Sequence, residues 1–221
     1  EMFEEKNLHI DVPESSFSPK VEEFIEKLSQ YETISFDIFD TLIFRPFAEP
    51  GDLFYFVGEK LGYMNFRRIR METEGEARWQ KYKEEESFEV TLQEIWKLLE
   101  EKTGLSAEKG MEIEMACEME FCYANPFMQA VYRRLQQLGK RIVIISDMYL
   151  SEVFLRQMLE KNGYIGYEGL YISCEYNKNK GSGELFELVR KERSIGKREA
   201  IHVGDNEHSD IMRAKKSGFD A

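Results

Sequence analysis

One short segment constrains the fold of this chain more than any other. Residues 34–42 read ISFDIFDTL, an apolar run interrupted and followed by Asp37, Asp40 and Thr41. In an open parallel α/β sheet, ligands bind at the edge formed by the carboxyl ends of the strands. The segment therefore predicts a buried strand that delivers the Asp37 carboxylate to such an edge.

Strand and helix patterns alternate through the C-terminal part of the chain. We expect strands at 142–145, 170–173 and 201–203, separated by helices. These helices are expected at 126–138, 151–161, 183–192 and 209–216, and a further helix at 19–30 precedes the first strand. Strands that alternate with helices predict an α/β fold with a parallel, doubly wound sheet.

Residues 45–123 differ from the rest because their patterns are helical and no strand is convincing. Asp52 heads one expected helix, 66–83 form another, Thr91 with Glu94 makes a capping box for a third, and Ser106 starts a fourth. We therefore predict an inserted all-helical cap at 45–123. The core would consist of residues 1–44 and 124–221, with 1–17 as an arm or linker.

The composition excludes some classes of function. A formal net charge of −12 over 221 residues argues against a broad basic face for nucleic acid. The three cysteines have neither metal-ligand spacing nor an even-numbered disulfide set, which is typical of a reduced, cytoplasmic protein. No apolar run approaches the ~20 residues of a membrane helix, and no signal peptide is visible. We expect a cytoplasmic protein without nucleic-acid or membrane partners.

Four polar signals lie at the carboxyl ends of expected strands or in the loops that follow them. They are Asp37, the pair Ser146-Asp147, Lys180, and the segment 204–210, which reads GDNEHSD. Each signal is weak by itself, because polar residues often follow strands. Their order and their shared context make the combination specific.

In that order, the signals resemble the four motifs of the haloacid dehalogenase (HAD) superfamily. Residues 45–123 stand where one class of HAD caps is inserted. The segment 36–42, with SDMYL at 146–150, is also similar to a bacterial subgroup that is often joined to glycosyltransferase modules. The resemblance implies a Rossmann-like, HAD-like core, a phosphatase-like hydrolase or phosphotransferase, and a covalently linked glycosyltransferase module as partner.

The resemblance also implies a metal site. Asp37 would attack the phosphorus of a small phosphorylated substrate and form an aspartyl-phosphate. Mg²⁺ would be held by Asp37, by the backbone carbonyl of Phe39, and by Asp205 with Asp210, directly or through water, because Mg²⁺ prefers hard oxygen ligands.

Other residues are implied in substrate binding. Lys180 would place its charge, and Ser146 its hydroxyl, on the phosphoryl oxygens, next to the backbone N–H of Asp147. Tyr149 would line the pocket. Arg45 has two interpretations of equal weight, a substrate contact and a salt bridge at the cap hinge. For Arg70, Glu74 and Arg78, spaced four residues apart, we favour a solvated ion-pair stripe over a substrate-facing surface.

Phe39 departs from the phosphatase pattern, in which an Asp at this place protonates the leaving oxygen. General acid–base help is worth ~10²–10⁴ in rate. Asp40 is one candidate replacement, and a turn residue is its simpler interpretation. The alternatives are a catalytically weakened binding or regulatory module fused to a glycosyltransferase, and a dehalogenase. The aspartates of segment 204–210 favour a metal site and phosphate chemistry over dehalogenation, because clustered carboxylates are costly without a cation.

Overall fold

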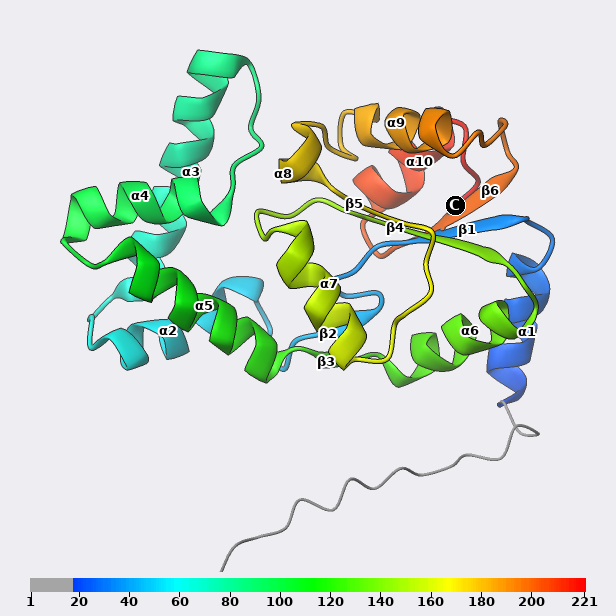
Figure 1. The fold of residues 1–221 in the computed structure, drawn as a ribbon, viewed down its shortest axis with the longest axis horizontal. Helices are drawn as coiled ribbons and strands as arrows, with labels where there is room; N and C mark the ends of the chain where they lie inside the picture. Colours follow the sequence, from blue (N-terminus) through cyan, green and yellow to red (C-terminus); the bar gives the residue numbers. More distant parts are fainter. Residues whose placement is uncertain (1–17) are drawn as a thin grey trace, which may run out of the picture.

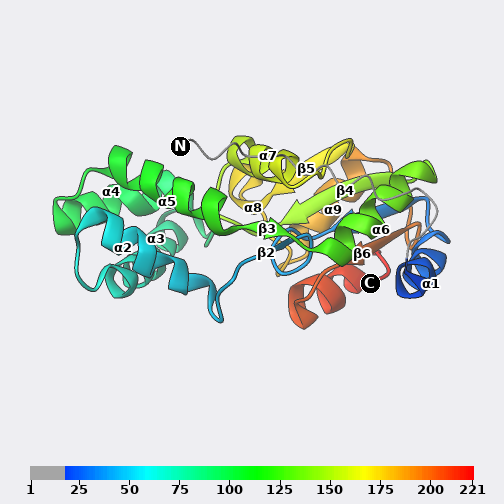
Figure 2. The ribbon, with the colours of Figure 1, turned by 90° about the horizontal axis from the view of Figure 1, so that it is seen from below.

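A computed structural model describes residues 18–221 and shows a four-stranded sheet with helices on both faces (Figure 1). A second group of helices lies to one side of this α/β body (Figure 2). The arm or linker predicted at residues 1–17 lies outside the described residues. Within 18–221, no helix combines the length and the apolar character needed to cross a membrane.

The sheet is parallel throughout, and its strands stand in the order β5-β4-β1-β6. The strands are β1 (Thr33–Phe36), β4 (Arg141–Ser146), β5 (Gly169–Ile172) and β6 (Ala200–Val203). The predicted α/β fold and its four strands are confirmed. Because β1 lies between β4 and β6, its carboxyl end is flanked by both neighbours, and the residue that follows it enters the centre of the edge.

The two faces of the sheet are covered by different helices. Along β4, Ile142 and Ile144 pack on the face covered by α1, α6 and α7, whereas Val143 and Ile145 pack on the face covered by α9 and α10 (Figure 1). This alternation explains the continuous apolar run of the strand, since both faces are buried. The helices are α1 (Pro19–Leu28), α6 (Pro126–Gln137), α7 (Glu152–Lys161), α9 (Glu184–Glu192) and α10 (Ala214–Lys216).

Two predicted elements differ from the structure at their ends. Ser173, expected to end a strand, instead begins the short helix α8 (Ser173–Tyr176). The helix expected at 209–216 begins earlier, as the π-helix η2 (Glu207–Arg213), and continues into α10. Asn206 caps η2 by accepting hydrogen bonds from the first backbone N–H groups of the turn.

The region 45–123 is helical, as predicted, and forms the second group of helices (Figures 1 and 2). Its elements are η1 (Pro50–Asp52), α2 (Leu53–Leu61), α3 (Phe66–Glu85), α4 (Leu92–Thr103) and α5 (Ala107–Phe121). The Thr91–Glu94 capping box is present at the start of α4. The sequence did not predict a two-stranded antiparallel ribbon, β2 (Ile43–Phe44) with β3 (Tyr123–Ala124), where the chain enters and leaves this cap. The division into domains at residues 44/45 and 123/124 stays a prediction.

The solvated stripe expected on α3 is wrong at Arg70, which is fully buried. The buried face of α3 consists of Phe66, Arg70, Thr73 and Ala77, which share one side of the helix. Arg70 forms a two-pronged ion pair with the buried Glu114 of α5, at 2.7 and 3.0 Å. Sequence patterns assign arginine to solvent, and a partner on another helix is visible only in the fold.

Arg70→Met is expected to lower the free energy of unfolding by about 3–5 kcal/mol, because Glu114 would stay buried without its partner. Arg68→Met on the same helix is the control, since Arg68 makes only an exposed pair worth ~0–1 kcal/mol. Urea unfolding followed by circular dichroism measures both. Equal losses of unfolding free energy in the two variants would contradict the buried pair. Arg70→Met combined with Glu114→Leu should recover only part of the loss, because the buried Trp96 Nε1–H then loses its acceptor.

Candidate active site

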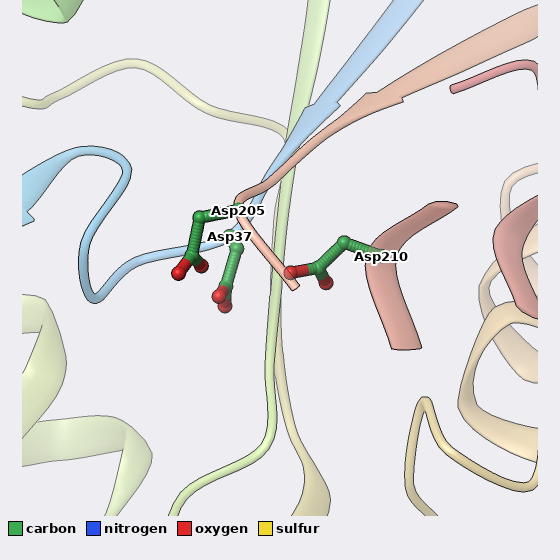
Figure 3. Close-up of side chains that lie close together, drawn as sticks. All are labelled: Asp37, Asp205 and Asp210. Atoms are coloured by element: carbon green, nitrogen blue, oxygen red, sulfur yellow. The ribbon is translucent and has the colours of Figure 1, made fainter. Parts of the chain in front are cut away.

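Three carboxylates converge at the carboxyl edge of the sheet. Asp37 directly follows β1 and donates its backbone N–H to the carbonyl of Val203 on β6 at 2.9 Å. Asp205 follows β6, and Asp210 lies in η2. One oxygen from each of the three aspartates lies within 4.8 Å of the other two (Figure 3). The structure thus brings together three side chains that the sequence predicted as one site.

Lys180 lies buried between two of these carboxylates. Its Nζ is 3.0 Å from Asp37 Oδ1 and 2.5 Å from Asp210 Oδ1. Burial alone would lower the pKa of Lys180, but the charges of Asp37 and Asp210 raise it, so the side chain stays an ammonium. The predicted positive charge is therefore present in the site.

Asp210 is held by three donors. Its carboxylate accepts hydrogen bonds from Lys180 Nζ, from His202 Nε2 at 3.1 Å and from the backbone N–H of Asn206 at 3.0 Å. Burial would raise the Asp210 pKa, but the His202 hydrogen bond and the Lys180 charge lower it, so this group stays ionised. His202 is itself buried, with its Nδ1 2.7 Å from the Ser35 hydroxyl, so both of its ring nitrogens have partners in the core.

The close approach of the Asp210 side chain explains why the segment after β6 begins with a glycine, Gly204. A Cβ atom built at Gly204 would lie 2.4 Å from Asp210 Cγ, well inside any permitted contact. A side chain here would push the Asp210 carboxylate away from Lys180. The glycine therefore permits the close approach on which the cluster depends.

Asp147 has a role that the sequence interpretation missed. Both of its carboxylate oxygens accept the backbone N–H of Lys180, at 2.9 and 3.1 Å, so Asp147 fastens the loop that carries this lysine. Burial raises the pKa of Asp147 to about 6, and the Lys180 charge offsets part of that rise. The only signal in the sequence was an acidic residue next to Ser146, which by itself indicates no partner.

A cavity of about 500 Å³ lies between the core and the cap and is lined by residues of both. Its walls include the predicted substrate-binding residues Arg45, Asp147 and Tyr149, but not Lys180 or the three clustered carboxylates. Ser146 lies buried at the end of β4 and is not in the cavity wall. The walls are formed by Phe39, Asp40, Arg45, Asp147, Met148 and Tyr149 from the core and its hinge, and by Pro50, Gly51, Phe54, Met71, Glu74, Gly75 and Arg78 from the cap.

The structure supports the hinge interpretation of Arg45 and leaves the substrate contact a prediction. Its Nε and Nη2 pair with both carboxylate oxygens of Glu118 on α5 at 2.9–3.1 Å, which is the predicted salt bridge at the hinge. It also lines the cavity, and its Cζ lies 4.0 Å from the centre of the Phe39 ring. Glu74 and Arg78 line the same cavity from the cap side, where the substrate-facing interpretation had placed them.

Asp40 lies in a tight turn. It is exposed, it has a left-handed backbone (φ 58°), and its N–H donates to the carbonyl of Ile43 at 2.8 Å. These features match the turn interpretation. Its carboxyl group still belongs to the cavity wall, so a role as acid or base stays a prediction.

The site suits a divalent cation. Asp37 Oδ1 is buried and forms no hydrogen bond within residues 18–221, although Lys180 Nζ lies nearby. The Phe39 carbonyl likewise accepts no hydrogen bond in this part of the chain. Three carboxylates and one ammonium leave a formal charge of −2, and burial together with the charge of Asp37 raises the pKa of Asp205. All donors are hard oxygens, as Mg²⁺ requires.

Asp37, Asp205 and the Phe39 carbonyl would therefore hold Mg²⁺. Asp210 has both of its oxygens occupied by protein donors. It would act on the ion through water or by placing Lys180, because Mg²⁺ usually keeps several waters.

Comparison with known proteins addresses the fold. No family model matches the chain, and no curated protein matches it either. Solved structures do match, each over 86% of this chain. The 2-haloacid dehalogenase of Pseudomonas syringae pv. tomato DC3000 has a TM-score of 0.61 with 18% identity, and 84% of that chain is covered. The fold is that of the haloacid dehalogenases.

Two further structures broaden the comparison. A HAD family enzyme of Bacteroides thetaiotaomicron has a TM-score of 0.63, with 16% identity and 91% of its chain covered. A magnesium-bound Bacillus subtilis protein described as a HAD-hydrolase has a TM-score of 0.57, with 15% identity and 86% of its chain covered. The predicted HAD-like core with a helical cap is thus confirmed as a fold. The predicted link to a glycosyltransferase gains no support from these structures.

Asp37→Asn and Asp205→Asn are each expected to weaken Mg²⁺ binding by about tenfold or more, because each removes a charged ligand. Isothermal titration calorimetry on the full chain measures the affinity. Glu207→Gln is the control, since Glu207 is exposed and lies outside the carboxylate cluster. Equal Mg²⁺ affinity in the wild type and both Asn variants would contradict the metal site.

Proposed function

We propose that this protein is a Mg²⁺-dependent hydrolase or phosphotransferase that acts on a small phosphorylated molecule through Asp37. The observation that carries the proposal is Asp37 beside the Lys180 ammonium, with the Asp205 and Asp210 carboxylates within 4.8 Å. A nucleophile, a fixed cation and a set of hard oxygen ligands meet at one point. Phosphoryl transfer requires little more than such positioning and charge stabilisation.

The chemistry assigned to the protein follows from this geometry. The Asp37 carboxylate would attack phosphorus and form an aspartyl-phosphate, which water would then hydrolyse. Lys180 would stabilise the charge on the phosphoryl oxygens, since an ammonium held in a buried site needs no reorganisation. Ser146 would donate its hydroxyl to the same oxygens. Bound Mg²⁺ would cancel the repulsion between Asp37 and a phosphate dianion.

The cap would close the site from solvent. Cap residues form more than half of the cavity wall, so a substrate bound there would contact both parts of the chain. Closure of a cap excludes water and completes the site in many enzymes. We propose that the cap selects the body of the substrate, while the edge of the sheet binds its phosphoryl group.

Three further proposals rest on the sequence. Two of them, which follow from the resemblance, are a covalently linked glycosyltransferase module as partner and, as the alternative function, a catalytically weakened binding or regulatory module. The third, a cytoplasmic location, rests instead on the cysteine pattern. Phe39 supports the alternative, since no acid stands at that place in the sequence. The ionised Lys180–Asp210 pair beside Asp37 supports an enzyme, because a buried ammonium at this place can stabilise charge on a reacting substrate.

Dehalogenation is the second candidate. Phe39 favours it, as does the likeness to a Xanthobacter autotrophicus L-2-haloacid dehalogenase with chloropropionic acid covalently bound, at 13% identity and a TM-score of 0.58. The convergence of Asp37, Asp205 and Asp210 weighs against it, because a metal-free reaction leaves that negative charge uncompensated. Halide release from 2-chloropropionate after chelation of divalent cations would establish this candidate.

Phosphate release from 4-nitrophenyl phosphate and a sugar-phosphate panel tests the proposed function. We expect activity that requires Mg²⁺ and falls by at least about 10³-fold in Asp37→Asn, since the nucleophile is removed. Phe39→Asp should raise the rate on sugar phosphates, because it supplies an acid. Glu207→Gln is the control for added mutations at the edge of the site. A wild type that is inert with Mg²⁺ on every ester, and that Phe39→Asp does not activate, would contradict hydrolysis.

A further inference from the structure

We propose that Phe39 and Arg45 select phosphoryl donors whose leaving group departs as a stable oxyanion, namely acyl phosphates and phosphoanhydrides. The inference deepens the proposed function and rests on it, because it requires Asp37 to attack phosphorus. It assigns Arg45 a direct contact with the leaving oxygen, and it identifies the bond that the site breaks.

The position of the leaving oxygen follows from the geometry of phosphoryl transfer. The attacking and leaving oxygens lie roughly in line across phosphorus. Asp37 approaches from the carboxyl edge of the sheet, so the leaving oxygen points away from the sheet. The cavity beneath the cap begins two residues beyond Asp37, at Phe39, and its core wall also includes Arg45, so our proposal places the leaving group there. The leaving group therefore meets an aromatic ring and a guanidinium.

Arg45 can stabilise a departing anion. Nε and Nη2 are engaged by Glu118, whereas Nη1 forms no hydrogen bond within residues 18–221. The Phe39 ring, 4.0 Å from Cζ, and the two-pronged Glu118 pair hold the guanidinium in one orientation. A guanidinium remains protonated in proteins, so it donates a hydrogen bond but cannot transfer a proton. Arg45 thus suits a leaving group that needs charge stabilisation and no acid.

The carboxyl groups of the cavity wall are poorly placed to serve as the acid. Glu74 accepts hydrogen bonds from Arg70 and Arg78, which lower its pKa against the effect of burial and keep it ionised. Asp147, whose pKa burial raises to about 6, is bound through both oxygens to the Lys180 N–H. Asp40 lies in the exposed turn. Of these three residues, Asp147 and Asp40 are the ones that the experiment must exclude as general acids.

The proposed reaction balances without an acid. An Asp37 oxygen forms a bond to phosphorus, and the bond from phosphorus to the leaving oxygen breaks. Its electron pair stays on that oxygen, which departs as a carboxylate or a phosphate. Water then attacks the phosphorus of the aspartyl-phosphate, the bond to Asp37 breaks, and inorganic phosphate and one proton are released. An alkoxide leaving group would instead need a proton, and losing acid help costs ~10²–10⁴ in rate.

The first experiment needs no variant. Phosphate release by the full chain with Mg²⁺ is measured on acetyl phosphate, inorganic diphosphate, 4-nitrophenyl phosphate and glycerol phosphate, after subtraction of the uncatalysed rate. We expect kcat/KM on acetyl phosphate or diphosphate to exceed that on glycerol phosphate by about 100-fold or more. Comparison of the first two probes distinguishes an acyl phosphate from a phosphoanhydride.

Arg45 is tested by Arg45→Met with Glu118→Leu, because replacing both partners avoids a buried unpaired carboxylate. We expect kcat on the preferred anionic leaving group to fall by about 10²-fold, as for loss of one oxyanion donor, with glycerol phosphate changed far less. Arg67→Met is the matched control, since Arg67 also pairs with a carboxylate, Asp52, and stacks on a ring, Tyr55, outside the cavity. Urea unfolding verifies that each variant is folded.

The outcomes separate this inference from the proposed function. A kcat/KM on glycerol phosphate within tenfold of the values on acetyl phosphate and diphosphate would overturn the inference. It would leave the proposed function standing. A selective loss of glycerol phosphate activity in Asp147→Asn or Asp40→Asn would also overturn the inference, because an acid would then exist. No release from any probe with Mg²⁺ would overturn both. A steep leaving-group preference that disappears in the Arg45 double variant is the result that supports it.

Discussion

The site depends on one buried ammonium. Lys180 lies between Asp37 and Asp210, and without it two carboxylates would face each other at the centre of the sheet edge. Taking an ammonium out of water is costly unless charged partners surround it. Other residues therefore position both partners of this contact. Asp147 binds the backbone of the Lys180 loop, while Gly204 leaves room for the Asp210 side chain and His202 donates a hydrogen bond to it.

The cap is joined to the core by similar means. Arg45 at the hinge pairs with the buried Glu118 of α5, and Arg70 from α3 places its guanidinium 5.0 Å from the ring centre of Tyr149. The carbonyl of Tyr149 also accepts the backbone N–H of Leu92 at the start of α4, at 2.8 Å. Because Tyr149 follows the β4 edge and Arg45 lies over Phe39, the position of the cap and the shape of the cavity are coupled.

Local sequence patterns were enough to predict most of the fold and the four charged residues of the site. Asp37, Lys180, Asp205 and Asp210 each follow a strand whose apolar run is readable, and parallel strands bring their carboxyl ends to one edge whatever the loop lengths. The β2–β3 ribbon was not predictable, because two paired residues give no period to detect. Arg70 was misplaced for a related reason, since its partner lies 44 positions away.

The order of strands and helices, the inserted helical region and the identity of the converging charges could all be predicted from the sequence, because period, capping and motif order are local properties. Which charges neutralise one another became visible only in the fold. The Asp147 carboxylate proved to fasten the Lys180 backbone, and Arg45 proved to lie over Phe39 with Glu118 behind it. Those pairings join loops and helices that are distant in the chain, and their energies depend on burial, which a sequence does not specify.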